Sequence, residues 1–303
     1  MNGILAVRKE CGFTSHDVVA KLRGITRQRK IGHTGTLDPQ AEGVLPVCLG
    51  HATKLCDLLT DQDKTYEAEL YLGITTDTQD RTGQVLASRD STVTREELSL
   101  ILIRFTGELM QVPPMYSAIK VGGKKLYELA RQGREVERAA RPVTIRQIEL
   151  LSCECRENGY VRKARLRVSC SKGTYIRTLC HDIGNALGCG GCMGELLRTR
   201  VGGFFLKDCL TLSEIQKLSD DGTLESRLIP VDAMFPDYPV LRTRSGHETQ
   251  LNAGNPVPAH WLAAKEGGPA KDGRYRLYGA DGRFLGIYED TGRAEYRPVK
   301  LFL

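Results

Sequence analysis

The group best placed for chemistry is a single carboxylate, Asp38, within residues 32–39, Gly-His-Thr-Gly-Thr-Leu-Asp-Pro. Glycines allow backbone conformations and close approaches that side chains forbid, and a residue before proline is pushed toward extended backbone. The segment is therefore predicted to be a loop of fixed shape that presents Asp38. Loops of this kind usually serve a ligand, on which an ionised carboxylate could act.

Two side chains elsewhere could complete a site. Tyr66 lies in residues 64–72, where alternating apolar positions predict a strand with the tyrosine facing inward. Arg177 follows a glycine turn and begins a helix predicted over residues 174–187. A buried aspartate needs a charge partner because burial otherwise protonates it, and Arg177 could be that partner. From composition alone, an ordinary Asp-Pro turn, a core tyrosine and a surface arginine are the favoured explanation of these residues.

Several other chemistries lack their signature. The run that starts at Asp61 begins like a calcium loop but lacks its glycine and its final glutamate. Residues 123–125, Gly-Lys-Lys, lack the upstream glycine and the hydroxyl residue of a phosphate-binding loop. Cys189 and Cys192 have no second pair at zinc-site spacing, so no metal is expected. A serine-hydrolase turn of the G-x-S-x-G type is also missing from the sequence.

Size and composition predict an ordinary globular protein of about two domains, since 303 residues compare with roughly 150 per domain. No apolar run approaches the roughly 20 residues of a membrane span, and charged residues from Arg8 onward come too early for a signal peptide. We therefore expect a cytoplasmic protein whose ten cysteines are reduced.

The net charge of +6 is mild, but basic residues cluster before the Asp38 loop. They are Lys21, Arg23, Arg27, Arg29 and Lys30, and their clustering favours a polyanionic partner.

The elements that must position these residues alternate irregularly between strand and helix. This order predicts an α+β fold around a mixed, mainly antiparallel sheet flanked by helices. Strands are predicted at residues 3–7, 44–49, 64–72, 143–153 and 161–170. Helices are predicted at residues 15–24, 52–59, 94–105, 174–187 and 193–200, and after Thr211. The strand at residues 161–170 is expected to have one buried face and one basic face.

Two segments differ in amino-acid composition from the rest of the chain. Residues 116–141 are polar, basic and punctuated by glycine, and they are interpreted as an insertion. From about residue 228 the chain becomes rich in proline and glycine, with short predicted strands. We therefore expect a larger domain over residues 1–227 and a small β-rich domain over residues 228–303.

Five blocks of this sequence resemble the tRNA pseudouridine synthase B family. The first is the Asp38 loop with its continuation to Lys54, and the others occur in the family's order. They are residues 63–66 Asp-Lys-Thr-Tyr, 112–120 Val-Pro-Pro-Met-Tyr-Ser-Ala-Ile-Lys, 171–179 Ser-Lys-Gly-Thr-Tyr-Ile-Arg-Thr-Leu and 196–199 Leu-Leu-Arg-Thr. The resemblance covers residues 3 to about 215, and a looser one relates the C-terminal segment to PUA-type RNA-binding domains.

The resemblance implies the pseudouridine synthase fold and an isomerase. Such an enzyme would convert uridine 55 in the T-arm stem-loop of tRNA to pseudouridine by breaking the glycosidic C–N bond and rejoining the ring through carbon. No cofactor, metal, membrane or obligatory protein partner is implied, and we expect a monomer. A base in a folded arm must first be flipped out, which costs a few kcal/mol.

The resemblance also assigns roles to residues. Asp38 would be the catalytic carboxylate, Arg177 its ion-pair partner and Tyr66 the ring against the target uracil, and the insertion at residues 116–141 would close over the RNA. His33 would support displaced nucleotides, and Leu197 would line the pocket. Substrate contacts are further expected from Lys9, Lys64, Tyr175 and Lys120.

Two departures from the family pattern lie close to the loop. Lys9 is followed by Glu10 where the family often has proline, which affects the rigidity of that entry turn. Glu42 stands where a small residue is common, so its charge could raise the pKa of Asp38 or face solvent.

Three routes stay open for the reaction. Asp38 could attack the sugar carbon, attack the uracil ring, or assist loss of the base to a glycal while Tyr66 takes the sugar proton; we favour the glycal route. A guide-RNA-dependent synthase with the same signature and a non-catalytic tRNA-binding or tRNA-folding protein are the alternatives.

Overall fold

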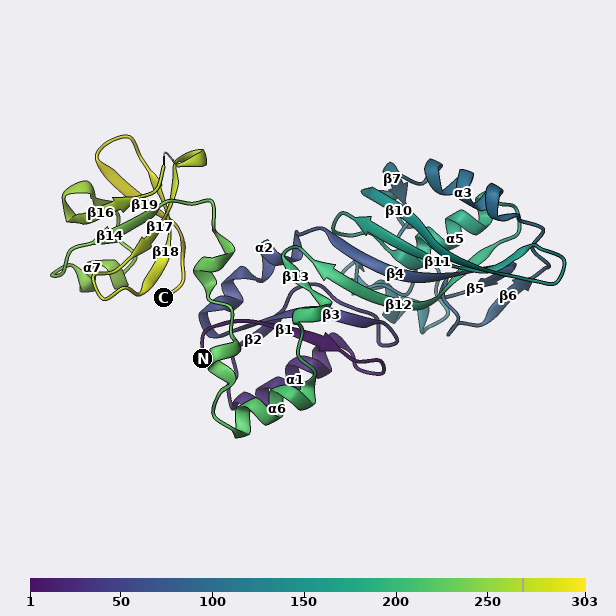
Figure 1. Ribbon diagram of the computed structural model, residues 1–303, viewed down its shortest axis with the longest axis horizontal. Coiled ribbons are helices and arrows are strands. Elements are labelled where there is room, and N and C mark those ends of the chain that lie inside the picture. The colour runs from purple at the N-terminus through teal and green to yellow at the C-terminus, as the bar shows by residue number, and fades with distance from the viewer. Residues whose placement is uncertain (269) are drawn as a thin grey trace.

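The computed structural model describes residues 1–268 and 270–303, in which a segment with short helical turns joins two large sheets (Figure 1). The larger sheet has nine strands. Seven of them follow one path, in the order β1 (Gly3–Lys9), β3 (Glu42–Leu49), β12 (Gly191–Val201), β4 (Lys64–Leu72), β11 (Val161–Cys170), β10 (Arg141–Cys155) and β7 (Gly107–Gln111). The short strands β2 (Ile31–His33) and β13 (Phe204–Phe205) pair with β3 and β12. Among these described strands, β12 pairs in parallel with β3 and the other neighbours run antiparallel.

Helices pack on both faces of the larger sheet. The α-helices are α1 (Ser15–Thr26), α2 (Cys56–Thr60), α3 (Arg95–Arg104), α4 (Leu126–Ala130), α5 (Ile176–Ala186), α6 (Leu212–Asp220) and α7 (Glu248–Asn252). Short 3₁₀ turns are η1 (Gly50–Leu55), η2 (Leu206–Asp208), η3 (Leu224–Arg227), η4 (Val231–Met234), η5 (Ala259–Trp261) and η6 (Lys271–Gly273). Apolar residues of α3 and α5 share a core with β4, β10 and β11, while α1 and α6 lie side by side against β1 and β3 (Figure 1). The expected α+β architecture is confirmed.

Local sequence signals fix several of these boundaries. Thr14, Thr94 and Thr211 each cap a helix, and each helix returns a carboxylate from its third residue to the cap backbone. On β4 the alternate side chains are buried, as the sequence pattern predicted, so Tyr66 faces inward with only 8% of its surface exposed. These elements agree with their predictions because the signals that specify them lie within a few residues.

The helix predicted at residues 193–200 is wrong, because the segment belongs to strand β12 in the middle of the sheet. Irregular pairing with β4, between Met193 and Leu196 and again between Arg198 and Arg200, interrupts the strand's period-two burial pattern. The apolar spacing therefore looked helical. Pairing with β3 and β4 on its two sides outweighs that local pattern.

The exposed face of β11 is charge-balanced, contrary to the expected basic face. Lys163 contacts Glu69 at 3.1 Å, and both Arg165 and Arg167 contact Glu67 at 3.1 Å. Arg167 also reaches Glu149 at 2.8 Å. These cations are neutralised by carboxylates on adjacent strands, so this face offers little free positive charge.

The insertion at residues 116–141 contains a small hairpin and a helix. Strands β8 (Lys120–Val121) and β9 (Lys124–Lys125) pair with each other and lead into α4. A further hairpin, β5 (Ile74–Thr76) with β6 (Val85–Ser88), projects from the end of β4. The insertion therefore has its own local structure beside the large sheet.

The smaller sheet forms the C-terminal module and has six strands. Their order is β15 (Val257–Pro258), β19 (Glu295–Leu301), β18 (Phe284–Asp290), β17 (Arg274–Tyr278), β14 (Val240–Thr243) and β16 (Leu262–Glu266). The division expected at residue 228 stays a prediction. Residues 228–239 join the two sheets, and Ile229 hydrogen-bonds with Ile4 of β1.

The C-terminal module is seated on the first sheet. Phe302 and Ile287 share a buried apolar cluster with Ile4 of β1. Lys54 of η1 donates from its ammonium to the carbonyl oxygen of Leu301 at 2.9 Å. These contacts thus join β1 and η1 to β18 and to the end of β19.

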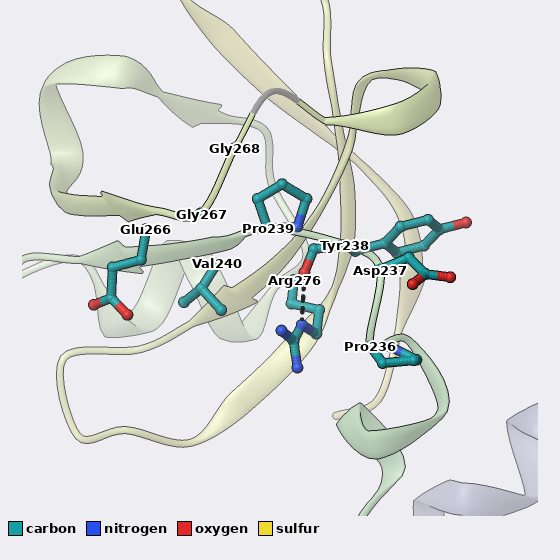
Figure 2. Close-up of a pocket in the computed structure, with 9 residues that line it drawn as sticks. All are labelled: Pro236, Asp237, Tyr238, Pro239, Val240, Glu266, Gly267, Gly268 and Arg276. Atoms are coloured by element: carbon teal, nitrogen blue, oxygen red, sulfur yellow. Dashed lines mark hydrogen bonds between the residues drawn. The ribbon is translucent and has the colours of Figure 1, made fainter.

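A pocket of about 340 Å³ lies where the joining segment meets the smaller sheet (Figure 2). It is lined by Pro236, Asp237, Tyr238, Pro239, Val240, Glu266, Gly267, Gly268 and Arg276. Arg276 Nε donates to the carbonyl oxygen of Tyr238 at 2.9 Å, which ties β17 to the joining segment (Figure 2). None of the residues singled out by sequence lines this pocket.

Tyr288 provides a stability prediction for the C-terminal module. Its side chain is fully buried, its hydroxyl has no hydrogen-bond partner among the described residues, and burial raises its pKa to about 12. Replacing Tyr288 by Phe is expected to stabilise the module by about 1 kcal/mol, because an unpaired buried hydroxyl is removed. Denaturant unfolding followed by fluorescence of Trp261, the single tryptophan and a part of this module, measures the effect.

Tyr278→Phe is the matched control for this prediction. The Tyr278 hydroxyl donates to Asp232 Oδ2 at 2.6 Å, so its removal is expected to destabilise the module by about 1 kcal/mol. If both substitutions lower the unfolding midpoint, the Tyr288 hydroxyl has a partner and the prediction is wrong.

Candidate active site

The Asp38 loop connects β2 to β3 and is held from several sides. The backbone N–H of Leu37 donates to Ser15 Oγ at 3.0 Å, and the N–H of Gly12 donates to the carbonyl of Pro39 at 2.9 Å. Gly35 has a φ of +86°, a conformation that favours glycine. The loop therefore has the fixed shape that its sequence predicted.

Asp38 and Arg177 form a two-point ion pair. Arg177 Nε lies 2.9 Å from Asp38 Oδ2, and its Nη2 donates to Oδ1 at 3.3 Å. The same guanidinium donates to the carbonyl oxygens of Thr78 at 3.1 Å and Tyr116 at 2.9 Å. Helix α5 thus brings together two residues 139 positions apart, and the expected pairing is present.

The charge state of Asp38 depends on opposing influences. Burial raises the pKa of Asp38, the Arg177 guanidinium lowers it, and the nearby Asp80 carboxylate raises it again, with a net increase above the ordinary value. Solvent still reaches 41% of the Asp38 side chain, compared with 6% of the Arg177 side chain. Protein atoms surround the carboxylate while one side stays open, so a ligand could approach it there.

Tyr66 stands beside Arg198 on neighbouring strands. The two residues are register partners between β4 and β12, and both side chains are buried. Burial raises the pKa of Tyr66, whereas the positive charge of Arg198 opposes the rise. Burial therefore disfavours loss of the phenolic proton, and the nearby Arg198 charge favours it.

Lys9 does not lie where a direct RNA contact requires it, which corrects the sequence-based expectation. It is fully buried, and its ammonium donates to the carbonyl oxygens of Glu10, Pro39 and Ala41 at 3.0, 3.1 and 2.6 Å. Burial lowers its pKa. Lys9 thus supports the Asp38 loop from beneath instead of facing a substrate.

Lys64 is also largely enclosed, with 7% of its surface exposed. Its ammonium donates to the carbonyl oxygens of Thr60 and Gln62, both at 2.6 Å. Burial lowers the pKa of Lys64 to about 8. In this arrangement it fixes the start of β4, the strand that carries Tyr66, and any substrate contact from its ammonium requires these bonds to break.

The remaining expected site residues have different degrees of exposure. His33 on β2 packs edge-on against His16 with ring centroids 5.2 Å apart, and burial lowers its pKa. Leu197 on β12 and Tyr175 at the start of α5 are half-buried, and Gln111 hydrogen-bonds both backbone polar groups of Tyr175. Lys120 is exposed at the start of the β8–β9 hairpin. Their proposed substrate contacts stay predictions.

The sequence is similar to known proteins over its whole length. The sequence profile described as TruB family pseudouridylate synthase (N terminal domain) matches residues 23–176, and that of the tRNA pseudouridylate synthase B C-terminal domain matches residues 177–236. The tRNA pseudouridine synthase B of Lachnoclostridium phytofermentans is 53% identical over 100% of both chains. The chain belongs to the TruB pseudouridylate synthase family. The protein of the same name from Bacillus pumilus is 41% identical over 99% of this chain and 97% of its own.

Solved structures agree with this membership of the TruB family. A chain in the crystal structure of a Cbf5-Nop10-Gar1 complex aligns with a TM-score of 0.70 and 26% identity, over 99% of this chain and 85% of that one. A chain in an H/ACA RNP bound to a substrate RNA containing 2'-deoxyuridine aligns with a TM-score of 0.69 at 24% identity, over the same shares, which speaks for the fold alone. The pseudouridine synthase fold is thus confirmed, and the chain is an isomerase of the TruB family.

The sequence interpretation missed the second carboxylate at Arg177. Asp80 Oδ2 lies 3.7 Å from Arg177 Nη1, and Asp80 Oδ1 accepts hydrogen bonds from Thr78 and Thr82. The run Thr78-Gln79-Asp80-Arg81-Thr82-Gly83 is typical of a tight turn, which was the available signal. The turn fixes Thr78, whose carbonyl accepts from Arg177.

Neither Glu42 nor the Cys189–Cys192 pair contributes to the candidate site. Glu42 lies 3.5 Å from Arg8 and is half exposed, and the shift in the Asp38 pKa has other causes.

The ten cysteines are free thiols. Within the described residues, no group of three or more His, Cys, Asp or Glu side chains could hold a metal ion, and no helix has the length and apolarity to cross a bilayer.

Proposed function

We propose that this protein isomerises uridine 55 in the T-arm of tRNA to pseudouridine, with Asp38 as the catalytic carboxylate. The observation that supports it most directly is the Asp38–Arg177 pair, an ionisable carboxylate that is held by a buried guanidinium and open on one side. The relatives that match the chain over its full length carry the name tRNA pseudouridine synthase B. Their shared name supplies the substrate class for this proposal.

Positive charge near the loop supports an RNA substrate. Lys21, Arg23, Arg27, Arg29 and Lys30 are exposed around the end of α1. None of them has a carboxylate within ion-pair distance in the described part of the chain. Phosphates could therefore bind there without displacing an existing partner. Such contacts offset the few kcal/mol that base extrusion costs.

The chemistry follows from the arrangement of Asp38 and Tyr66. The target nucleotide swings out of its stack and occupies the open side of Asp38, where the enclosed site limits capture of the detached base by water. In the route we favour, the N1–C1′ bond breaks with its electrons passing to uracil, while Tyr66 takes the proton from C2′. The base turns, C5 bonds to C1′, the 2′ proton returns and the C5 proton leaves to solvent.

The other proposed contacts complete the site. His33 supports the displaced nucleotides, Leu197 lines the uracil pocket, and the insertion at residues 116–141, with exposed Lys120 at its hairpin, closes over the stem-loop. Arg177 contacts this insertion through the carbonyl oxygen of Tyr116, so closure and the Asp38 ion pair are linked. The C-terminal module would act as a PUA-like RNA-binding domain.

The test uses the purified chain and an unmodified tRNA transcript without other proteins or RNA. Pseudouridine is mapped by carbodiimide modification and primer extension, with a transcript carrying cytidine at position 55 as the control. We expect one pseudouridine, at position 55, and none in the control. Modification elsewhere contradicts the site, and turnover only after addition of guide RNA and partner proteins favours a guide-dependent synthase. Binding without modification would favour an RNA-binding or RNA-folding protein.

A further inference from the structure

Arg198 occupies the point where three parts of the candidate site meet. Strand β12 lies between β3 and β4, and at Arg198 it pairs with Gly43 on one side and with Tyr66 on the other. A side chain at position 43 would collide with the Arg198 backbone, and Gly43 has a φ of +119°. The close parallel pairing of β12 with β3 therefore places Arg198 next to the strand that follows the Asp38 loop and beside its register partner Tyr66.

The hydrogen bonds of Arg198 all end on carbonyl oxygens of that loop and its following strand. Nε donates to Val44 at 2.7 Å, Nη2 to Gly35 at 3.3 Å and Nη1 to Thr36 at 3.4 Å. These carbonyls lie on both sides of Asp38 in the sequence. The guanidinium thus holds the two ends of the segment that carries the carboxylate.

Arg198 is also a buried cation without an anionic partner. Only 1% of its surface is exposed, and no carboxylate among the described residues lies within 4.0 Å of its guanidinium. Arg177, in contrast, is neutralised by Asp38. Burying an unneutralised charge is costly, and its positive potential remains available to the nearest ionisable group.

Tyr66, the register partner of Arg198 on β4, is an ionisable group beside it. Its ring is enclosed, so burial raises the pKa of Tyr66, and the charge of the Arg198 guanidinium is the largest influence that lowers it. Asp38 raises the pKa of Tyr66 further by its negative charge. Each of the two reacting side chains therefore has its own guanidinium, Arg177 for Asp38 and Arg198 for Tyr66.

Within the pseudouridylation proposed above, we propose that Arg198 is a positioning residue that stabilises the phenolate form of Tyr66, the form that takes the C2′ proton. The phenolate accepts that proton as the glycosidic bond breaks, and the C2′–H electron pair forms the C1′–C2′ double bond of the glycal. The phenol returns a proton to C2′ when C5 bonds to C1′. Arg198 keeps its own proton throughout, because a guanidinium is effectively never deprotonated in proteins.

A double-mutant cycle tests this role with single-turnover rates at saturating tRNA. Arg198→Gln is expected to slow the wild-type reaction by about 10-fold, which corresponds to a shift of about one unit in the Tyr66 titration. In the Tyr66→Phe background the same substitution should have almost no further effect, because the group on which Arg198 acts is gone. An equal loss in both backgrounds would mean that Arg198 only supports the loop, and would overturn the proposal.

Lys9→Met is the matched control, because Lys9 is a second buried cation that binds carbonyls of the same loop. Its effect on the rate should be the same in the wild-type background and in the Tyr66→Phe background, since Tyr66 is not its partner. If Arg198→Gln does not fold, the cycle is run with Arg198→Lys, which keeps the charge and loses the fork. If Arg198→Lys lowers the rate by the same factor in the wild-type and the Tyr66→Phe backgrounds, the proposal is again overturned.

A second measurement does not depend on activity. Tyrosine labelled with ¹³C at Cζ gives a signal for residue 66 that is assigned by its absence in Tyr66→Phe. Its titration is expected to move upward by about one pH unit in Arg198→Gln. An unchanged midpoint overturns the proposal. A wild-type protein that forms no pseudouridine would instead overturn the function, so the two failures are distinguishable.

Discussion

Asp38→Asn is expected to reduce tritium release from C5-tritiated uridine in tRNA by at least about 10³-fold. Asparagine keeps the size of the side chain but cannot carry the negative charge or accept the two-point contact from Arg177. All three routes considered for the reaction use that charge. Single-turnover release at saturating tRNA measures the effect without a contribution from product dissociation.

Asp90→Asn is the matched control for the loss of an aspartate that contacts an arginine. Asp90 pairs with Arg156 at the surface, far along the chain from the Asp38 loop, and 82% of its side chain is exposed. This variant is expected to keep its rate, because exposed pairs contribute little to stability. Release by Asp38→Asn at the wild-type rate would defeat the assignment of Asp38 as the catalytic carboxylate.

Arg177→Met is expected to produce the second large effect, by about 10²-fold in rate. It leaves Asp38 without its cation and leaves the carbonyls of Thr78 and Tyr116 without their donor. Burial already raises the pKa of Asp38, and losing Arg177 raises it further. A carboxyl with a higher pKa ionises only at higher pH, so the rate of the variant should climb toward alkaline pH where the wild type has levelled off.

The pH profile of the single-turnover rate measures this change. We expect the acid limb of Arg177→Met to lie at least about one pH unit above that of the wild type. Arg177→Lys keeps the charge but has no fork, so its limb should lie between the two. A profile for Arg177→Met that overlays the wild type would show that Arg177 does not control the ionisation of Asp38.

Sequence predicted those parts of the site whose signals are local. The glycine and proline positions around Asp38 specified a fixed loop, and the period-two pattern of β4 specified an inward Tyr66. The pairing of Asp38 with Arg177 could be inferred because a buried carboxylate requires a cation. Physical reasoning offered Arg177 as a possible partner, and the family resemblance then assigned it that role.

The cations beneath the loop could not be placed from sequence. Lys9 was expected at the RNA, yet its partners are carbonyl oxygens about 30 residues away, and nothing local distinguishes such a lysine from a surface one. Arg198 was hidden in the same way, because its segment was predicted as a helix and lies in the sheet. Both errors arise from contacts between segments distant in the chain, which outweigh local propensity.

The contact between the C-terminal module and β1 also affects how the protein folds during synthesis. Ile4 and Phe302 share one apolar cluster, so nearly the whole chain must leave the ribosome before that cluster can close. Until then, the flank of β1 and η1 that receives Phe302 stays open to water and to chaperones. Synthesis of this protein therefore includes a late docking step, in which Phe302, directly after β19, covers a surface to which β1 contributes.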